Sequence, residues 1–474
     1  MSLPKTINEL RTSEYKTLSV KEEIKKNLVR RLKDPAPLFP EIVGYDASVI
    51  PQIINAHLSF HNMLLLGERG QAKSRILRSL VSLLDPLIPA IKGCEINDNP
   101  FSPLCKICRE LVSKYGDGVE IEWIERERRY GEKLATPDVA IGDLIGDVDP
   151  IKVAEGRYLS DELTIHFGLI PRTNRGIFAI NELQDLPERV QVGLFNIMEE
   201  GDIQIKGYRI RLPLDILIVA TENPEDYTNR GRIITPLKDR FEAQIRTHYP
   251  RERNIEVKIM ENESKIKPHD GLRLVVPGFM KDIISEITFQ ARRSPDINQK
   301  AGVSVRMTIS NYETLLANAE RRSIILGEKD IVPRICDLYY LPPSTNGKIE
   351  LEYTGKEDDE TEIVHRFIRK SIKAVFDEYF NPDDFKNVIE VFKKGATMDV
   401  SDIMPAVEYF GFLKEFPEFK TKLSVLGLEE CNGAYASATE FILESLYLHN
   451  LLSKNIVGNK YHYIGSSVKK GYSE

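Results

Sequence analysis

Three short apolar runs in the first half of the chain have the pattern of buried strands in a parallel sheet. They cover residues 63–66, 175–180 and 214–221, and each ends in glycine or polar residues. Apolar positions with helical spacing, beginning at Ile76 and Leu77, follow the first run. Parallel strands covered on both faces give nearly continuous apolar runs. The pattern therefore predicts an α/β fold with a parallel sheet.

The second half of the chain changes to helical spacing. Residues 250–335 show it, and beyond an acidic stretch at 356–362 further helices are predicted, one with Ile372, Val375 and Phe376 on a single face. Residues 451–463 predict a helix that leads into a small β-wing, as in winged-helix folds. Residues 201–212 alternate apolar and polar positions across Gly207, which predicts a β-hairpin.

Composition narrows the class of protein. The 474 residues, 42% hydrophobic and 29% charged, suggest two to four soluble domains. No apolar run approaches the ~20 residues of a membrane span, and the N-terminus lacks the apolar region of a signal peptide, so we expect a cytoplasmic protein. A net charge of −7 makes a broad nucleic-acid surface unexpected.

Residues 64–74, Leu-Leu-Leu-Gly-Glu-Arg-Gly-Gln-Ala-Lys-Ser, have the layout of a phosphate-binding P-loop. Backbone amides at the start of a helix would surround the phosphates, Lys73 would reach the β- and γ-phosphates, and the Ser74 hydroxyl would bind Mg²⁺. Ala72 stands where a glycine is usual, which we expect to cost little because we take this position to be helical. The alternative is a glycine turn between core elements. The predicted ATP-binding residues of the loop are Gly67, Gly70, Gln71, Ala72, Lys73, Ser74 and Arg75.

The second apolar run ends in Asn181 and Glu182, where a parallel strand delivers side chains to a ligand crevice. This is the layout of a Walker B strand, in which Glu182 would orient the water that attacks the γ-phosphate. Asn181 stands where an aspartate usually holds Mg²⁺ through its water shell. It can accept a hydrogen bond but lacks the charge, which puts Mg²⁺ affinity and turnover in question. The alternative interpretation of the pair is a helix cap.

Three of the five cysteines lie together in residues 94–108. Cys105 and Cys108 have the spacing of half a zinc site, with Cys94 as a third thiolate and Asp98 as a fourth ligand. No second Cys-x-x-Cys or histidine pair follows. Reduced cysteines on an ordered loop and thiol redox control are the alternatives.

The order of these elements resembles an AAA+ ATPase module over roughly residues 38–335. Within that class, segments 39–46, 93–108, 135–138, 144–149, 168–176 and 201–212 are similar to the magnesium-chelatase I subunit and its MoxR-type relatives, which carry a hairpin inserted within helix 2 before the Walker B strand. The resemblance implies an adenine pocket lined by Ile42, Val43 and Gly44, a sensor 1 at Asn223, an arginine finger at Arg240 and a sensor 2 at Arg306. The alternatives are a surface pair of Arg240 with Asp239, and a helix-start contact for Arg306.

The resemblance also implies a domain plan. It comprises an N-terminal helical segment (1–34), the α/β ATPase core (35–249), a helical lid (250–340) and a mainly helical C-terminal domain (341–474). The implied function is an ATP- and Mg²⁺-dependent motor that assembles as a ring, of six subunits in such proteins, and remodels a protein partner. Two alternatives are a nucleotide-gated scaffold with little hydrolysis, because of Asn181, and a nucleic-acid-associated ATPase.

Overall fold

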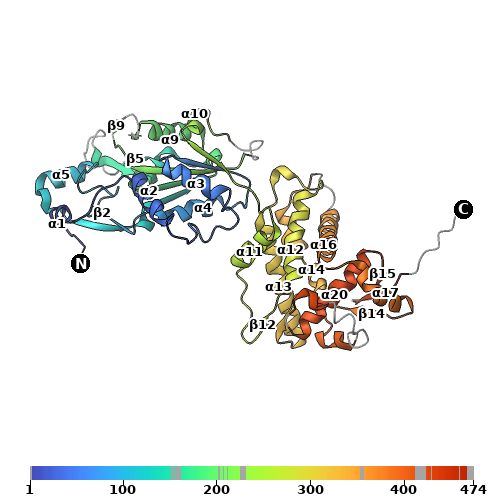
Figure 1. The fold of residues 1–474 in the computed structure, drawn as a ribbon. Helices are drawn as coiled ribbons and strands as arrows, with labels where there is room; N and C mark the ends of the chain where they lie inside the picture. The colour runs from blue at the N-terminus through green and yellow to red at the C-terminus, as the bar shows by residue number, and fades with distance from the viewer. Residues whose placement is uncertain are drawn as a thin grey trace. The chain divides into compact units, whose positions relative to one another are not determined.

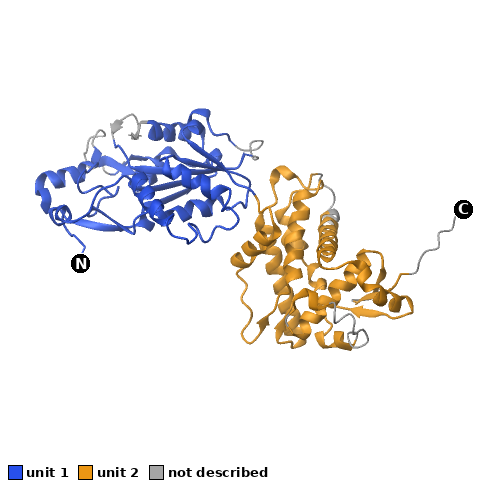
Figure 2. Ribbon diagram, viewed as in Figure 1, with its two compact units in different colours: residues 1–248 blue, residues 249–474 orange. Residues whose placement is uncertain are grey.

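The computed structural model describes residues 3–149, 151, 154, 162–200, 203–205, 208–210, 212–224, 231–352, 357–411, 423–428, 430–457 and 460–466. The chain forms two compact units, 1–248 and 249–474 (Figure 2). The boundary lies one residue before the predicted end of the ATPase core. Residues on both sides of position 340 belong to the second unit, so the predicted division between lid and C-terminal domain stays a prediction.

A five-stranded parallel sheet organises the first unit (Figure 1). The strands lie side by side in the order β11-β1-β10-β7-β4. β1, the first of the five along the chain, therefore lies between β11 and β10, the last two. The three predicted strands are confirmed, as β1 (Met63–Leu66), β7 (Gly176–Asn181) and β10 (Ile216–Glu222). The sequence reading missed β4 (Tyr130–Leu134) and β11 (Ala243–Arg246). Both are edge strands with polar or half-exposed positions, so neither forms an apolar run.

Side chains alternate between the two faces of the sheet, and both faces are covered. Met63 and Leu65 pack in one core, and Leu64 and Leu66 pack in the other. The first core is shared with α2 (Val20–Arg31), α3 (Val49–Leu58) and α4 (Lys73–Ser79), and the second with α1 (Ile7–Thr12) and α9 (Glu188–Glu200). The N-terminal helices are therefore part of the same packed unit as the sheet.

Three antiparallel strand pairs are inserted around this sheet. β2 (Leu87–Ile91) pairs with β3 (Ile121–Glu125) and encloses the cysteine segment and α5 (Lys106–Tyr115). β5 (Gly146–Val148) pairs with β6 (Ile165–Phe167), and β8 (Ile203–Ile205) pairs with β9 (Tyr208–Ile210). The predicted hairpin in 201–212 is thereby confirmed. Its turn at 206–207 lies outside the described residues.

The second unit is mainly helical and has one large core. Its longer helices are α11 (Arg253–Glu263), α12 (Gly278–Arg293), α13 (Val305–Leu326), α16 (Glu357–Tyr379), α17 (Lys386–Lys393) and α20 (Asn432–Leu448). Buried residues of α12 and α13 share this core with those of α16, α17 and α20. No helix in the described part of the chain is long and apolar enough to cross a membrane.

The predicted β-wing is confirmed after α20, but the helix predicted to begin at Leu451 is wrong: α20 ends at Leu448, and Leu452–Val457 is itself the first strand of the wing. β15 (Leu452–Val457) and β16 (Lys460–Gly465) form an antiparallel pair, and β14 (Met398–Val400) adds a third strand beside β16. Residues 433, 434 and 436–446 of α20 are buried. In winged-helix proteins that read DNA, the helix before the wing enters the groove. Here that helix is a core element of the unit.

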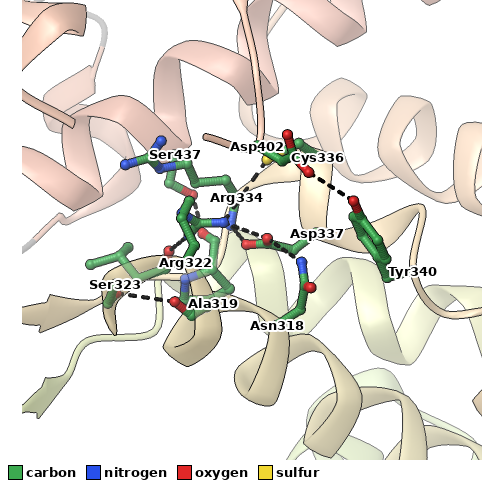
Figure 3. A network of polar contacts seen from close by, with 12 residues as sticks. Asn318, Ala319, Arg322, Ser323, Arg334, Cys336, Asp337, Tyr340, Asp402 and Ser437 are labelled. Carbon is green, nitrogen blue, oxygen red and sulfur yellow. Dashed lines mark hydrogen bonds and ion pairs between the residues drawn. The ribbon is translucent and has the colours of Figure 1, made fainter. Parts of the chain in front are cut away.

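A buried polar network joins the first and last parts of the second unit (Figure 3). Arg322 on α13 pairs with Asp337 on α14 (Ile335–Leu338), and both side chains are nearly inaccessible. Arg334 donates from Nη1 to the carbonyl of Met404 over 2.7 Å, and the Cys336 amide donates to Glu440 on α20 over 3.0 Å. The helices of the predicted lid are thereby bonded to the C-terminal helices.

Candidate functional site

The loop between β1 and α4 has the backbone of a phosphate site. Gly70 has a φ of 78°, which a glycine adopts without steric cost. A Cβ on Gly67 would lie 2.0 Å from Oγ1 of Thr247, so only glycine fits there. Lys73 is buried, and its Nζ donates to the carbonyl of Gly67 and, over 2.8 Å, to that of Glu68. The predicted lysine therefore lies against its own loop, and its role in phosphate binding stays a prediction.

A second layer of hydrogen bonds holds this loop in place. The Tyr45 hydroxyl lies 3.0 Å from the carbonyl oxygen of Gln71 and 2.7 Å from that of His248. Oγ1 of Thr247 donates to Oε1 of Gln71 over 2.7 Å. Burial raises the pKa of Tyr45 to about 12, so the phenol remains a donor. Val43 and Gly44, which precede Tyr45, are half-buried, and their role in an adenine pocket stays a prediction.

The expectation for Ala72 was wrong in its premise. Ala72 is not helical: it precedes α4 with φ 56° and ψ 15°, in the left-handed region. An L-residue there is strained by roughly 1–2 kcal/mol because its Cβ approaches the following carbonyl oxygen. The strain lies inside the predicted phosphate loop. Left-handed non-glycine residues are concentrated at functional sites, which agrees with that role.

The end of β7 connects to the P-loop through Asn181. Oδ1 of Asn181 accepts from the Ser74 hydroxyl over 2.8 Å, and its Nδ2 donates to Oε1 of Glu132 over 2.6 Å. Glu132 lies on the neighbouring strand β4 and also accepts two 2.8 Å hydrogen bonds from Arg78, on α4. The hydrogen bond from Arg78 is the main cause that lowers the pKa of Glu132, so this carboxylate is ionised.

Glu132 is the residue at this site that the sequence reading missed. It lies on an edge strand that was itself not predicted, and only the register of β4 against β7 brings it beside Asn181. The Glu132 carboxylate supplies a negative charge within hydrogen-bond reach of Asn181, which lacks the charge of the usual aspartate. An asparagine can donate to Glu132 and accept from Ser74 at the same time, whereas an aspartate offers only acceptors.

Replacing Asn181 with aspartate is therefore expected to weaken Mg²⁺-dependent ATP turnover, although it restores the usual Walker B residue. Two carboxylates at this distance repel each other, and one would take up a proton or move away. We expect the Mg²⁺ concentration that gives half-maximal turnover to rise about tenfold. This is the effect of repulsion that shifts the pKa of one of the two carboxyl groups by about one unit, because one pKa unit corresponds to a factor of ten. The double variant Asn181→Asp with Glu132→Gln should recover the turnover, because the glutamine then donates the hydrogen bond and the aspartate accepts it. An improvement by Asn181→Asp alone would contradict this account.

Glu182 follows Asn181 in a strained conformation. Its φ is 56° and its ψ is 49°, again in the left-handed region. Its backbone N–H donates to Oγ1 of Thr221 on β10 over 2.9 Å, and Oε2 accepts from Nε2 of Gln184 over 2.8 Å. One contact thus fixes the backbone of Glu182 and the other its half-exposed carboxylate, at the carboxyl end of the sheet. This placement fits the predicted role, which stays a prediction.

Asn223 comes directly after β10, at the same edge of the sheet as Glu182. β10 and β7 are parallel, with Ala220 opposite Ile180, so their carboxyl ends lie side by side. Asn223 is buried, and the preceding Glu222 is fully buried and paired with Lys238 over 3.0 Å. This ion pair fixes α10 (Thr235–Asp239) to the end of β10. The role of Asn223 as sensor 1 stays a prediction.

Arg240 caps the C-terminus of α10 and has a different partner from the one considered. It forms an ion pair with Glu199 on α9, and its guanidinium lies 5.4 Å from the ring centre of Phe195. Its side chain is 39% exposed. The described residues show no ion pair of Arg240 with Asp239. An arginine held at the surface by one neighbour is available to a second subunit, and the arginine-finger role stays a prediction.

Arg306 lies in the second unit, at the second position of α13. Oγ of Ser304 caps this helix and accepts from the Arg306 backbone N–H over 3.1 Å. The side chain of Arg306 is exposed. The helix-start contact considered for Arg306 is therefore made by its backbone, and the guanidinium is left for another role. Its role as sensor 2 stays a prediction.

The predicted metal ligands come together in the first unit. Ligand atoms of Cys94, Asp98, Cys105 and Cys108 all lie within 4.8 Å of one another. This is the one group of three or more such residues found in the described part of the chain. It lies in the insertion between β2 and β3, apart in sequence from the P-loop and from Glu182.

Comparisons with known proteins agree with the motifs. A family model described as the sigma-54 interaction domain matches residues 155–243. The chain is 27% identical to the magnesium-chelatase subunit ChlI-2, chloroplastic, of Arabidopsis thaliana, over 52% of this chain and 56% of that protein. It is 31% identical to a magnesium-chelatase subunit ChlI homolog of Methanocaldococcus jannaschii, over 44% of this chain and 53% of the other. The family resemblance inferred from the motifs is thereby confirmed.

The chain spans a little over half the length of these two relatives. Among solved structures, a chain from the complex between subunits BchI and BchD of magnesium chelatase aligns with 69% of this chain and 99% of its own length. The identity is 19% and the TM-score 0.36.

Proposed function

We propose that this chain, which resembles the AAA+ ATPases of the magnesium-chelatase I and MoxR-like group, hydrolyses ATP and uses the energy to remodel a protein partner. The observation that carries the proposal is the contact between the P-loop and the end of β7. The Ser74 hydroxyl and Asn181 are hydrogen-bonded, and the next residue is the strained Glu182. This arrangement supports a role of Ser74 and Asn181 in Mg²⁺ binding and of Glu182 in water activation.

The motor would work as a ring of identical chains. Arg240 lies at the surface, just after α10, and would complete the site of a neighbouring subunit, where a guanidinium offsets the charge that develops on the γ-phosphate. ATP and Mg²⁺ would bind at the P-loop residues and at Ser74 and Asn181. Rotation of a lid that carries Arg306 would convert hydrolysis into movement.

The two other functions have less support. A pure scaffold needs no oriented carboxylate after β7, yet Glu182 is held by two hydrogen bonds. A nucleic-acid role through the winged helix is disfavoured because α20 is buried in the core of its unit. The remodelled partner in this proposal is a protein. In the specific form of the proposal, that partner is a subunit that inserts a metal ion. We propose that the assembly works in the cytoplasm.

The test is Mg²⁺-dependent ATP turnover measured over a series of protein concentrations. A shared site requires two chains, so turnover per chain should rise steeply with concentration and level off once rings are formed. Light scattering on the same samples would report assembly. Tight ATP binding without turnover at any concentration would contradict the motor and favour the scaffold.

A further inference from the structure

The cysteine insertion of the first unit has the geometry of a mononuclear metal site. Cys94 lies shortly after β2, Asp98 in the following loop, and Cys105 and Cys108 at the start of α5. Their ligand atoms lie within 4.8 Å of one another. Thiolates bound to one tetrahedral zinc ion at about 2.3 Å are about 3.8 Å apart, so small side-chain adjustments bring all four ligands to one ion.

Backbone amides hold the ligand atoms of the cluster in place. The amide of Asp98 donates to Sγ of Cys94, and the amide of Cys108 donates to Sγ of Cys105, each over 3.4 Å. The amide of Cys105 donates to Oδ2 of Asp98 over 2.9 Å and so fixes the carboxylate toward the cysteines.

One atom in the cluster lacks the partner that burial requires. Asp98 is fully buried, and its Oδ1 has no hydrogen-bond partner among the described residues. A buried polar atom left unpaired destabilises the fold, and a charged one does so more strongly. A cation bound to Oδ1 removes this destabilisation. A cavity of about 110 Å³, lined by all three cysteines, lies beside the cluster and gives an ion a route to it.

We propose that Cys94, Asp98, Cys105 and Cys108 bind one structural zinc ion. Three thiolates select a soft or borderline metal and exclude Mg²⁺ and Ca²⁺, which prefer oxygen ligands. An iron–sulfur cluster distributes its thiolates over two or more irons and therefore spaces them more widely than one ion does. Because all four ligands come from the protein, the ion has no open position for substrate, as in structural zinc sites.

The ion would hold the loop that supports the start of β7. The carbonyl of Ile96 accepts from Nδ2 of Asn174 over 3.0 Å, and Nδ2 of Asn97 donates to the carbonyl of Arg172 over 3.0 Å. Arg175, the residue before β7, donates from Nη1 to the carbonyl of Pro89 over 2.7 Å. The zinc site therefore fixes residues 94–98 against the segment that leads into the strand ending at Asn181.

Metal analysis of the purified full-length chain tests the proposal directly. We expect about one zinc ion per chain by inductively coupled plasma mass spectrometry. The reduced, metal-free chain should bind Co²⁺ with the intense thiolate charge-transfer bands and visible bands of a tetrahedral site. Neither measurement depends on a variant that folds. Removal of zinc should also change the fluorescence of Trp123, which lies on β3 and is the single tryptophan of the chain.

Variants then assign the ligands. Cys105→Ser with Cys108→Ser should remove the zinc, whereas Cys431→Ser, a buried cysteine of the second unit, should retain all of it. Asp98→Asn keeps the acceptor for the Cys105 amide, so it should leave the fold intact while zinc is lost to a competing chelator at about tenfold lower chelator concentration.

Three results would overturn the proposal. They are a metal-free chain that gives no cobalt bands, a thiol count that shows a disulfide among the three cysteines, and iron with inorganic sulfide in place of zinc. None of these results bears on ATP turnover, so the zinc site and the motor can fail separately.

Discussion

Mixing equal amounts of Glu182→Gln and Arg240→Ala chains is expected to restore about a quarter of the unaltered ATP turnover, although each variant alone is inactive. A site needs Glu182 from its own chain and Arg240 from the next chain around the ring. In a randomly mixed ring, half of the chains carry Glu182 and half of their neighbours carry Arg240, so about one site in four is complete. This holds for a ring of any size.

The single variants should each lose most of their activity for a different reason. Without the Glu182 carboxylate, the attacking water loses its general base, which contributes about 10²–10⁴-fold to the rate. Without the Arg240 guanidinium, the charge on the transferred phosphoryl group is not offset, which costs about 10³–10⁵-fold. ATP binding should persist in both variants, because Lys73 and the loop amides are unchanged.

Phosphate release in the mixture, at a concentration where rings are formed, is the measurement. Glu199→Gln is the matched control: it removes the ion-pair partner of Arg240 within the chain but leaves Arg240 itself, so turnover should be kept or increased. A mixture with only the residual activity of its parents would show that the site is not shared between chains. If the Arg240→Ala chain is active by itself, Arg240 is not the arginine finger, while the other parts of the proposal stand.

The apolar pattern predicted the centre of the sheet and missed its edges. β1, β7 and β10 are buried over most or all of their length, and burial on both faces requires the continuous apolar run that the sequence shows. β4 reads Tyr-Gly-Glu-Lys-Leu, and none of its residues is fully buried. Its position is set by pairing with β7, which is a long-range interaction that local periodicity does not encode.

The candidate site was likewise predicted in part from the sequence and missed in part. Lys73, Ser74, Asn181 and Glu182 could be predicted because each follows a recognisable strand at a fixed spacing. Glu132 could not, because its role comes from register between strands. The left-handed backbone of Ala72 was also missed, since an alanine in the place of a glycine suggests a relaxed helical position, whereas the loop retains the conformation that glycine favours.

In the second unit, Asp337→Ala is expected to lower the free energy of unfolding by about 3–5 kcal/mol, because it leaves the buried guanidinium of Arg322 without its counter-charge. Asp337 also accepts from Nδ2 of Asn318 over 2.6 Å and from the Arg334 amide over 2.7 Å, as Figure 3 shows in part. Three donors therefore lose one acceptor group. Asp337→Asn keeps the shape and the acceptor oxygen, so it should cost less.

The chain allows this loss to be assigned to one unit. Its single tryptophan, Trp123, lies in the first unit, so tryptophan fluorescence follows that unit, while far-ultraviolet circular dichroism follows both. In urea, Asp337→Ala should move the dichroism transition to lower denaturant and leave the fluorescence transition in place. Asp270→Ala, at an exposed position of the same unit, should move neither. If Asp337→Ala also leaves both transitions unchanged, the network does not hold the two helical parts together, and the lid would be free to move independently of the C-terminal helices.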